Sequence, residues 1–578
     1  MFDTQGGESQ KISRHLRISP NPSDHLKSAG LYINRPSRVD SHADSMSMIL
    51  GRVPRSLSVR LAKVGYRQPR AKATSLIRLI SQNAVASARS SGLNDLPLAY
   101  TWLTRTPGQI TPDDVLSNVS PIPESLSSLD YVPVLLITSA FAHWIDVSSN
   151  PFLEQFINSL YPSTPSHESL RPVHAIVAVV DKLPDLRVRL EEIGDSKTPS
   201  DSDGVSLLLV KAEDIQGIIA VPRRVRSMEA AESSLVFKLQ NDAFSKASQR
   251  STHELGLRLA NTIFINGNDT TLFGTRWTYT PSQQYTLEQS VNFSNCTVTS
   301  AVASVQNSFK LPLYPVGQRR RVISSMGNIL RQLAKHTDSQ STEPMPASSE
   351  LEKELPRYIE EHGIVDRRVS VWALIENSEN GFHLENNANI QESLVKAIRA
   401  GGKLHRVMSG GGGWGKKQGL LSLDPETTFV EADNEQGLLG LEDLFADQER
   451  QPLSDISPPP PAFFEMPQLD ESMSSLSQAA GPGDYIQFFV SVESDHTPDS
   501  LNDGSMRLTF GIVADSEAIP SSSDRMEKDL GVVSQFFGAL SEKAITYSQP
   551  VIGTGASDSL KSSAKFDIPG CRVALVVE

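Results

Sequence analysis

The apolar residues of this chain come in short runs, and this pattern limits the folds that are open to it. The longest run, residues 132–142, has the length of a β-strand and falls well short of the ~20 apolar residues that span a bilayer. Apolar residues nevertheless make up 38% of the 578 residues, which is enough for packed cores in two or three domains. We therefore expect a soluble body without a transmembrane segment.

Strand and helix signals alternate over the first half of the body. The runs 132–142 and 173–180 are continuous and typical of buried strands, and Phe152, Phe156 and Leu160 between them indicate a helix. Further strand signals cover residues 205–210, 215–221, 235–239 and 286–303. Residues 259–277 predict a hairpin, because Asn266-Gly267 favours a tight type I′ turn. We expect a mixed α/β domain over residues 95–340.

A polar linker over residues 341–355 is predicted to lead into a smaller α+β unit. Its first part, residues 356–423, holds a half-buried strand over 369–373, a helix over 390–398 and a strand over 404–408. Its second part, residues 484–578, holds two antiparallel strands (486–492 and 506–512), a helix over 526–544 with a capping-box start at Asp524 and Glu527, and a last strand over 572–577. The predicted fold class is therefore α/β, mixed α+β.

An acid-rich stretch separates the two parts of this unit. Residues 424–471 contain thirteen acids and one base, and they are interrupted by Pro458 to Pro461. We predict that residues 424–483 form a disordered acidic insert. Two apolar clusters inside it, 438–445 and Phe463-Phe464, are candidates for docking on a partner or on the body, although a simple spacer is the preferred interpretation.

The N-terminal charge pattern is typical of a mitochondrial transit peptide. Residues 1–94 carry fifteen Lys/Arg and five Asp/Glu, and no acid occurs from Ser45 to Asn94. Apolar residues recur at helical spacing opposite arginines there, and Met46 or Met48 is a plausible true start. We predict a disordered leader over residues 1–94 and a location in the mitochondrial matrix. A basic arm that stays on the mature protein is the alternative.

Two motifs are candidates for binding an anion or a nucleic acid. The first is residues 318–335, where Val322, Met326, Ile329 and Leu333 predict an amphipathic helix with a basic rim. Its basic candidates are Arg319, Arg320, Arg321 and Arg331. They are suited to contacting RNA phosphates, an acidic partner or anionic lipid, or to forming the solvated rim of a helix docked on the sheet.

The second motif is a glycine-rich segment that follows the strand 404–408. Its candidate residues are Gly410, Gly411, Gly412, Gly413, Trp414, Gly415, Lys416 and Lys417. The segment matches G-x-x-x-x-G-K, but Lys417 stands where a phosphate loop needs Ser or Thr for magnesium, and no long helix follows. Backbone amides with two lysines suit an anion, whereas Trp414 suits either base stacking or a plug in the core.

Three segments give the chain a resemblance to known sequences. GGGGWGKKQGLLSLDP (410–425), VISSMGNILRQL (322–333) and NTIFINGNDTTLFGTRW (261–277) resemble segments of a family of uncharacterised fungal proteins with mitochondrial-type N-termini. The similarity covers most of residues 130–425. It implies an organellar protein and carries no activity.

Motifs for catalysis and for metal binding are scarce. The two cysteines exclude a cysteine-based zinc module, the twelve histidines lack metal-ligand spacing, and we expect no metal and no cofactor. His143 and Asp146 follow the strand 132–142, where α/β folds place ligands, but a hydrogen-bonded turn is the preferred interpretation of this pair. We predict a matrix binding or assembly factor without catalytic chemistry, with a protein or RNA partner in mitochondrial gene expression. The alternative is an enzyme that binds a nucleotide or phosphate ligand through residues 410–417.

Overall fold

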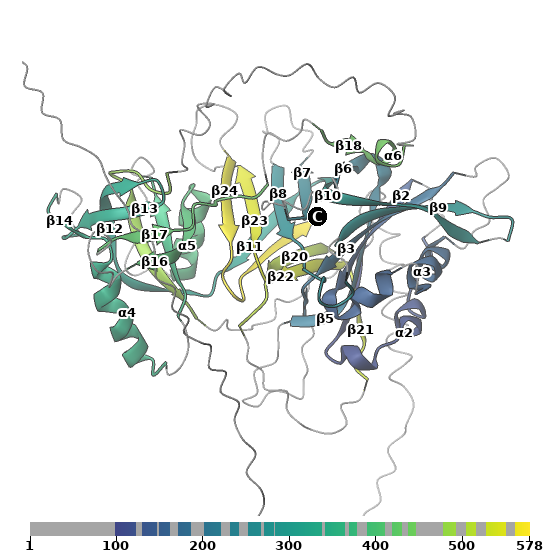
Figure 1. Cartoon of the computed structure of the whole chain (residues 1–578), viewed down its shortest axis with the longest axis horizontal. Helices are drawn as coiled ribbons and strands as arrows, with labels where there is room; N and C mark the ends of the chain where they lie inside the picture. The colour runs from purple at the N-terminus through teal and green to yellow at the C-terminus, as the bar shows by residue number, and fades with distance from the viewer. Residues whose placement is uncertain are drawn as a thin grey trace, which may run out of the picture. The chain divides into compact units, whose positions relative to one another are not determined.

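The computed structural model describes most of the chain beyond residue 98 (Figure 1). The described ranges are 99–122, 130–146, 150–161, 171–186, 201–220, 232–241, 252–267, 271–282, 284–337, 342–364, 369–377, 390–410, 419–430, 437–446, 478–492, 505–515, 528–550 and 561–577. All of them belong to one compact unit, Lys72–Glu578. Within these ranges, no helix is both long and apolar enough to cross a membrane.

A mixed sheet of fourteen strands is the largest element of the fold. Its main path runs through β21 (Gly531–Ser534), β1 (Ala99–Thr104), β5 (Asp201–Lys211), β2 (Tyr131–Thr138), β3 (Val173–Val180), β9 (Leu272–Tyr279), β10 (Tyr285–Val302), β7 (Ser234–Asn241), β8 (Thr252–Arg258), β23 (Ile545–Pro550) and β24 (Lys561–Phe566). Three short strands join from the side: β4 (Leu183–Pro184) on β5, β6 (Ile215–Ile219) on β10, and β18 (Leu439–Gly440) on β6. β2 and β3 are parallel, because the chain between them crosses over as a helical segment.

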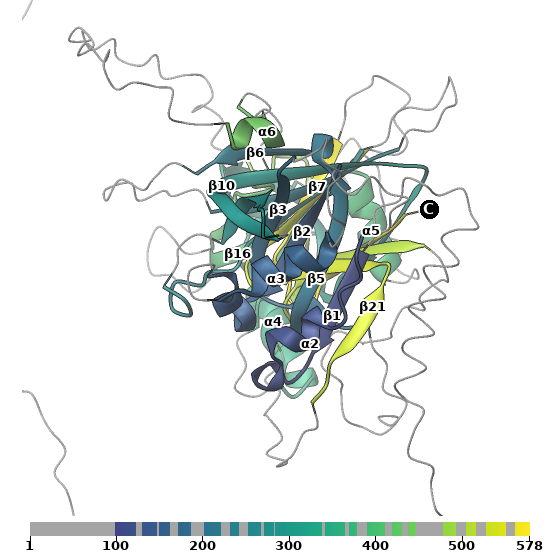
Figure 2. The same cartoon turned by 90° about the vertical axis from the view of Figure 1, so that its right-hand side faces the viewer.

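Both faces of the long sheet are covered near β2, β3 and β5. Leu135 and Ile137 of β2 pack with helical residues on one side, whereas Val134 and Leu136 join the core on the other. The helical side consists of η1 (Pro107–Gln109), α2 (Pro112–Leu116), η2 (Ser139–Ile145) and α3 (Phe152–Leu160). Figure 2 shows α2 and α3 over this part of the sheet. The short η3 (Ala212–Asp214) links β5 to β6.

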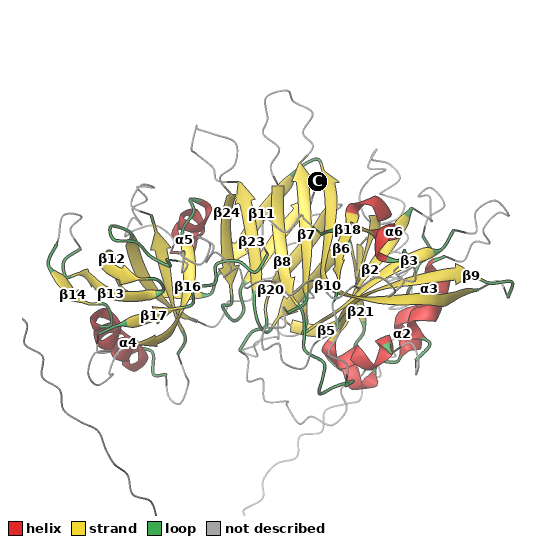
Figure 3. Cartoon of the chain, turned by 45° about the horizontal axis from the view of Figure 1, so that its top comes forward, coloured by secondary structure: helices red, strands yellow, loops and turns green. Residues whose placement is uncertain are grey.

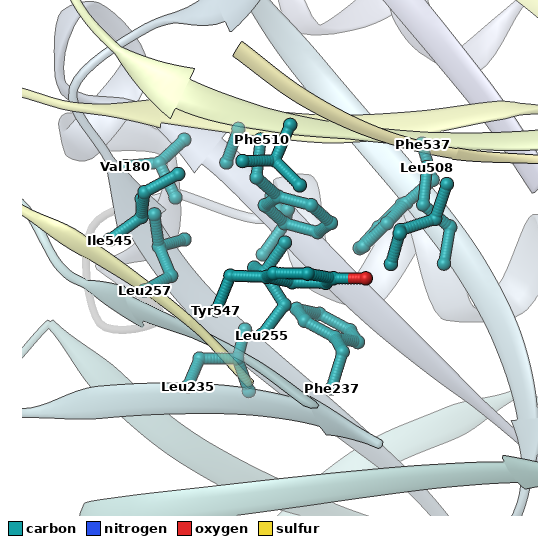
Figure 4. Packing of buried hydrophobic residues seen from close by; sticks show 14 of the residues in the cluster. Val180, Leu235, Phe237, Leu255, Leu257, Leu508, Phe510, Phe537, Ile545 and Tyr547 are labelled. Carbon is teal, nitrogen blue, oxygen red and sulfur yellow. The ribbon is translucent and has the colours of Figure 1, made fainter. Parts of the chain in front are cut away.

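A second sheet of four strands packs on the opposite face. It has the order β11 (Val305–Lys310), β25 (Arg572–Val577), β20 (Met506–Ile512), β22 (Phe536–Ser541). Figure 4 shows the core between the sheets, where Phe510 and Phe537 of the small sheet meet Phe237 of β7. The ring centroids of Phe237 and Phe510 are 5.1 Å apart.

The third sheet closes into a small antiparallel barrel. Its strands are β12 (Leu313–Met326), β19 (Tyr485–Ser491), β15 (Val371–Glu376), β16 (Lys403–Gly410), β17 (Leu421–Leu423) and β13 (Ile329–Ala334), and β12 pairs with β13 to close the ring. β14 (Pro344–Pro346) adds to β13, and α4 (Ser349–Glu361) and α5 (Ile390–Arg399) pack against the strands (Figure 3). Val371, Ala373 and Ile375 line the barrel core, whereas Trp372 and Leu374 join the core shared with α5. β15 is therefore buried on both faces, not half-buried as predicted.

The mixed α+β fold class is confirmed, and so are the elements with strong local signals. The structure contains strands at 131–138, 173–180, 403–410, 485–491, 506–512 and 572–577, and helices at 152–160 and 390–399. Residues 285–302 form one long strand. These runs are continuous or cleanly periodic, so local sequence was sufficient to identify them.

The predicted basic helix over residues 318–335 is wrong. These residues form the end of β12 and all of β13, joined by a two-residue turn, because Met326 pairs with Ile329. Gly327 has a φ of +59°, which the tight turn requires and which glycine adopts without strain. The apolar residues that suggested a helical face instead include Val322 and Leu333, which face the barrel core.

The predicted helix over residues 526–544 is also wrong where the structure describes it. Residues 531–534, 536–541 and 545–550 are the strands β21, β22 and β23. Gln535 has a φ of +55°, which breaks the chain between the first two. A side-chain carbon at Gly538 would lie 2.2 Å from the Thr509 carbonyl oxygen, so this glycine permits the contact with β20. Asp524 and Glu527 lie outside the described residues.

Two predicted strand pairings are not formed. The amides of Ile265 and Asn266 donate to the Thr262 carbonyl in a turn, and β9 pairs with β3 and β10 rather than with residues 259–265. Strands β19 and β20, predicted as neighbours, lie in different sheets. Local alternation identified the strands, but the partner of each strand depends on long-range packing.

The sheets also cross the predicted domain boundaries. β12 and β13, on the N-terminal side of residue 340, belong to the barrel, whereas β23 and β24 extend the long sheet from the C-terminal side. The predicted linker 341–355 contains β14 and the start of α4. Within the predicted insert, residues 424–430, 437–446 and 478–483 are described. Of these, residues 438–445 pack on the body, which confirms the docking alternative for this cluster.

Candidate functional site

Two of the four candidate arginines are engaged in ion pairs inside the barrel unit. Arg319 Nε lies 2.7 Å from Glu376 Oε2, and its guanidinium stacks 3.9 Å from the Tyr485 ring centroid. Arg320 lies 2.7 Å from the carboxylate of Glu350 and also donates to the carbonyls of Ala334 and Lys335. Glu376 and Glu350 are both buried. A buried carboxylate needs such a partner, so these two guanidiniums are occupied by the fold.

The other two arginines are more available. Arg321 is half-buried on β12, and Arg331 is exposed on β13. Neither makes an ion pair with any residue in the part of the chain that the structure describes. The predicted four-arginine rim is therefore reduced to two side chains on separate strands.

The strands on either side of the glycine-rich segment, β16 and β17, pair as a β-hairpin. Gly410 ends β16 and is the register partner of Leu421 in β17, so residues 411–420 join two antiparallel strands. A phosphate loop needs a helix after its glycines, and a strand follows here instead. Gly411, Gly412, Gly413, Trp414, Gly415, Lys416 and Lys417 lie outside the described residues.

The barrel brings one arginine to the base of this hairpin. β17 lies between β16 and β13, and Leu330 of β13 pairs with Leu421. Arg331, the next residue in β13, is therefore separated from Gly410, the last residue of β16, by the single strand β17. The structure thus places Gly410 and Arg331 near one another, whereas Arg319 and Arg320 are engaged elsewhere in ion pairs.

The carboxyl ends of β2 and β3 form a second candidate site. His143 is exposed in η2, and Asp146 is the residue directly after the end of η2. Asp181 follows β3, is buried, and accepts a 2.7 Å hydrogen bond at Oδ2 from the Glu542 backbone amide. Burial raises the pKa of Asp181 to about 6, against a weaker lowering by that hydrogen bond. Next to it, Lys182 Nζ donates to Asp203 Oδ2 at 2.8 Å.

This edge is polar, but the described contacts do not form a metal centre. Among the residues that the structure describes, no three His, Cys, Asp or Glu side chains lie close enough together to hold a metal ion. Asp181 is fixed by a backbone amide, and Lys182 is fixed by Asp203. The described contacts there are those of buried polar groups that hold the strand ends together.

The same edge carries a feature that the sequence analysis missed. Ile263, Phe264 and Ile265, which we call the apolar tip, are 43%, 98% and 53% exposed. The tip is anchored at both ends: Thr262 is fully buried, and Asn266 Nδ2 donates to the Ala142 carbonyl at 3.2 Å. The sequence has three apolar residues before Asn266-Gly267, but a run of that length does not distinguish a buried strand from an exposed turn.

Comparison with known proteins does not add a family. No protein-family model, curated protein or solved structure matches the chain. The resemblance to fungal mitochondrial-type proteins stays a prediction.

The arginine pairs generate a stability prediction. Glu350→Ala should lower the free energy of unfolding by about 3–5 kcal/mol, because it leaves the Arg320 guanidinium buried without its carboxylate. Glu361→Ala, which removes an exposed pair with Arg357 on the same helix, should cost less than about 1 kcal/mol. Urea unfolding of both variants makes the comparison. Equal, small losses would show that Arg320 is not committed to the fold.

Asp181 generates a prediction for the pH dependence of stability. The pKa of Asp181 is about 6 in the folded protein and lower in the unfolded chain, so the protonated carboxyl favours the folded state. This contribution to the free energy of unfolding is fully present at acid pH and is lost as the pH rises through about 6. Asp181→Asn keeps an oxygen acceptor for the Glu542 amide. The variant should therefore raise the free energy of unfolding by about 1–3 kcal/mol near pH 8 and change it little near pH 4. Urea titrations at both pH values, with the exposed Asp130→Asn as control, test this; an equal effect at both would contradict it.

Proposed function

We propose that this chain is a non-catalytic binding or assembly protein of the mitochondrial matrix, and that the apolar tip is its contact with a partner protein. The observation that carries the proposal is the almost complete exposure of Phe264 between two exposed isoleucines. A large apolar side chain in water is unfavourable by about 1.5–3 kcal/mol relative to burial. Adjacent exposed apolar residues typically mark an interaction site.

The anchoring of the tip supports a role in recognition. The amide of Ile263 donates to Asn261 Oδ1 at 3.1 Å, and the amides of Ile265 and Asn266 donate to the Thr262 carbonyl. The backbone is thus already ordered, so that a partner pocket gains the burial of Phe264 at a reduced entropic cost. Such a pre-ordered aromatic anchor is typical of protein interfaces.

Charge favours a protein over a membrane surface or RNA as the partner. Residues 259–267 contain no charged side chain, so the tip lacks the basic residues that attract anionic lipid or phosphate. On the barrel, Arg319 and Arg320 are already paired with buried carboxylates. An apolar pocket on a protein fits the tip best.

RNA is the second candidate partner, and one juxtaposition favours it. Arg331 and Gly410 lie on strands that flank β17, so an exposed guanidinium stands beside the base of the segment that contains Lys416 and Lys417. An RNA phosphate is the ligand that suits this barrel edge. The proposal for the tip does not depend on it.

The tip is tested by site-specific crosslinking in an extract of purified mitochondria. A photoreactive phenylalanine at position 264 should crosslink a protein, and Phe264→Ser should reduce recovery of that protein at least about tenfold while leaving stability within about 0.5 kcal/mol. The matched control is position 326, because Met326 is 62% exposed on the barrel hairpin. Equal crosslinking at 326, or crosslinking at 264 only to RNA or lipid, contradicts the proposal. Arg331→Glu reports on the RNA alternative separately.

The matrix location is tested with the N-terminal segment alone. A reporter fused to residues 46–94 should enter mitochondria, because this segment has no acid and nine Lys/Arg. Replacement of Arg52, Arg55 and Arg60 by Glu should abolish entry, measured as protection from external protease. Continued import of the altered reporter would show that positive charge is not the signal.

A further inference from the structure

A short piece of the acid-rich region is bound to the edge of the long sheet. β18 pairs antiparallel with β6, where Leu439 is opposite Gly217, and α6 (Leu441–Leu444) follows directly. Figures 1 and 2 both show α6 next to β6, and Figure 1 also shows β18 beside them. Leu441, Leu444 and Phe445 are buried, whereas Glu442 and Asp443 are exposed. We call residues 439–445 the docked motif; its pattern is Leu-x-x-Leu-Phe with acids on the outer side.

The sheet is shaped to receive the two large side chains of this motif. A side-chain carbon at Gly217 would lie 3.2 Å from Leu444 Cδ1, and one at Gly274 would lie 2.8 Å from Phe445 Cζ. The Phe445 ring is 4.8 Å from the buried ring of His174 and 6.5 Å from that of Phe293. Two glycines and two aromatic rings on β3, β6, β9 and β10 therefore make a seat for Leu444 and Phe445.

The mode of attachment is that of a peptide ligand. A few backbone pairs on a sheet edge supply affinity, and side-chain recesses supply specificity, as in β-strand addition. The docked motif has a ladder of only two residues and three fully buried side chains. It is also an apolar island in sequence, since residues 424–436 and 447–471 around it are rich in acids and Pro. Leu441, Leu444 and Phe445 join the main core, but the backbone of the segment pairs with the sheet through two residues, and such a segment is expected to open locally at lower free energy than the sheet beneath it.

We propose that this seat is a peptide-binding site for an acidic Leu-x-x-Leu-Phe segment of a partner protein, and that the chain's own docked motif occupies it as an intramolecular competitor. The occupant's chemistry is defined by the segment that is seated there: two apolar side chains in the recesses and carboxylates facing water. This site is separate from the apolar tip and does not rest on the function proposed for it.

Cys296 provides a built-in reporter of whether the seat opens. It is the register partner of Gly217, so its side chain shares the sheet face on which Leu444 packs. Cys296 and Cys571 are the two cysteines of the chain, and both are buried. Cys571 precedes β25 in the four-stranded sheet, away from β6 in the strand order, and serves as the internal control.

The experiment uses the full chain with a vacated seat, Leu444→Ser with Phe445→Ser. A fluorescent peptide of residues 437–446 should bind this variant, and it should bind the wild-type chain at least about tenfold more weakly, because the docked motif competes. The same peptide carrying both serine substitutions, at positions 444 and 445, should not bind. Adding Gly217→Ala to the vacated chain should weaken binding of the unsubstituted peptide at least about fivefold, because the added methyl group enters the Leu444 recess. Cys296 should react with a thiol reagent faster in the vacated chain, while Cys571 should not.

Two results would overturn the proposal. One is a vacated chain with a cooperative thermal transition that binds no peptide up to about 1 mM. If the vacated chain does not fold, hydrogen exchange of the wild-type chain decides: amides of residues 441–445 should exchange well before those of 296–298 in β10. Equal protection of the two sets would show that the motif is a permanent part of the core.

Discussion

The double burial of β2, β3 and β5 is the constraint on which the rest of the fold depends. Alternate residues of these strands enter two different cores, so that each face of the sheet must be covered by other elements. The short α2, η2 and α3 cover one face, and they come from the chain between these strands. The other face is covered by β11, β20, β22 and β25, and the last three of these come from the C-terminal part of the chain. Since apolar burial is the main favourable term in folding, the C-terminal strands must return to the N-terminal sheet, and the body folds as one compact unit.

The barrel shows how the same chain uses its charges. A run of three arginines suggests a surface for phosphate, but β12 directs Arg319 and Arg320 towards Glu376 and Glu350. Desolvated carboxylates and guanidiniums are tolerable only as pairs, so the two sets of residues require one another. Two of the four arginines of the predicted basic patch are thus engaged in ion pairs within the fold. Residues 259–267, which contain the apolar tip, carry no charged side chain, and this supports the proposal of a protein partner rather than a nucleic acid.

Local signals predicted the elements well and their partners poorly. The runs at 132–138 and 173–180 and the helices at 152–160 and 390–399 follow from continuous or 3.6-residue apolar patterns. Residues 318–335 fit a helical pattern by count, yet Gly327-Asn328 is also a hairpin signal and decides the structure. Nothing local indicates that β20 pairs with β25 or that β23 pairs with β8. For the candidate site, the sequence located the glycine-rich segment and the arginines, but the exposure of Phe264 and the pairing of Arg320 depend on neighbours that are distant in sequence.

The acid-rich region shows why composition alone misassigns a segment. Its average charge predicts a spacer, because repulsion and low apolar content disfavour a packed core. The average conceals one turn in which Leu441, Leu444 and Phe445 are all buried. Each such side chain contributes about 1.5–3 kcal/mol on burial, while each ordered backbone residue costs about 1–2 kcal/mol, so for residues 439–445 the burial of three side chains does not exceed the cost of ordering seven residues by a wide margin. A segment in that balance is bound in the structure yet remains within reach of a competing ligand. Gly217 and Gly274 belong to β6 and β9 of the long sheet, so the recesses that receive Leu444 and Phe445 are built by residues outside the docked motif.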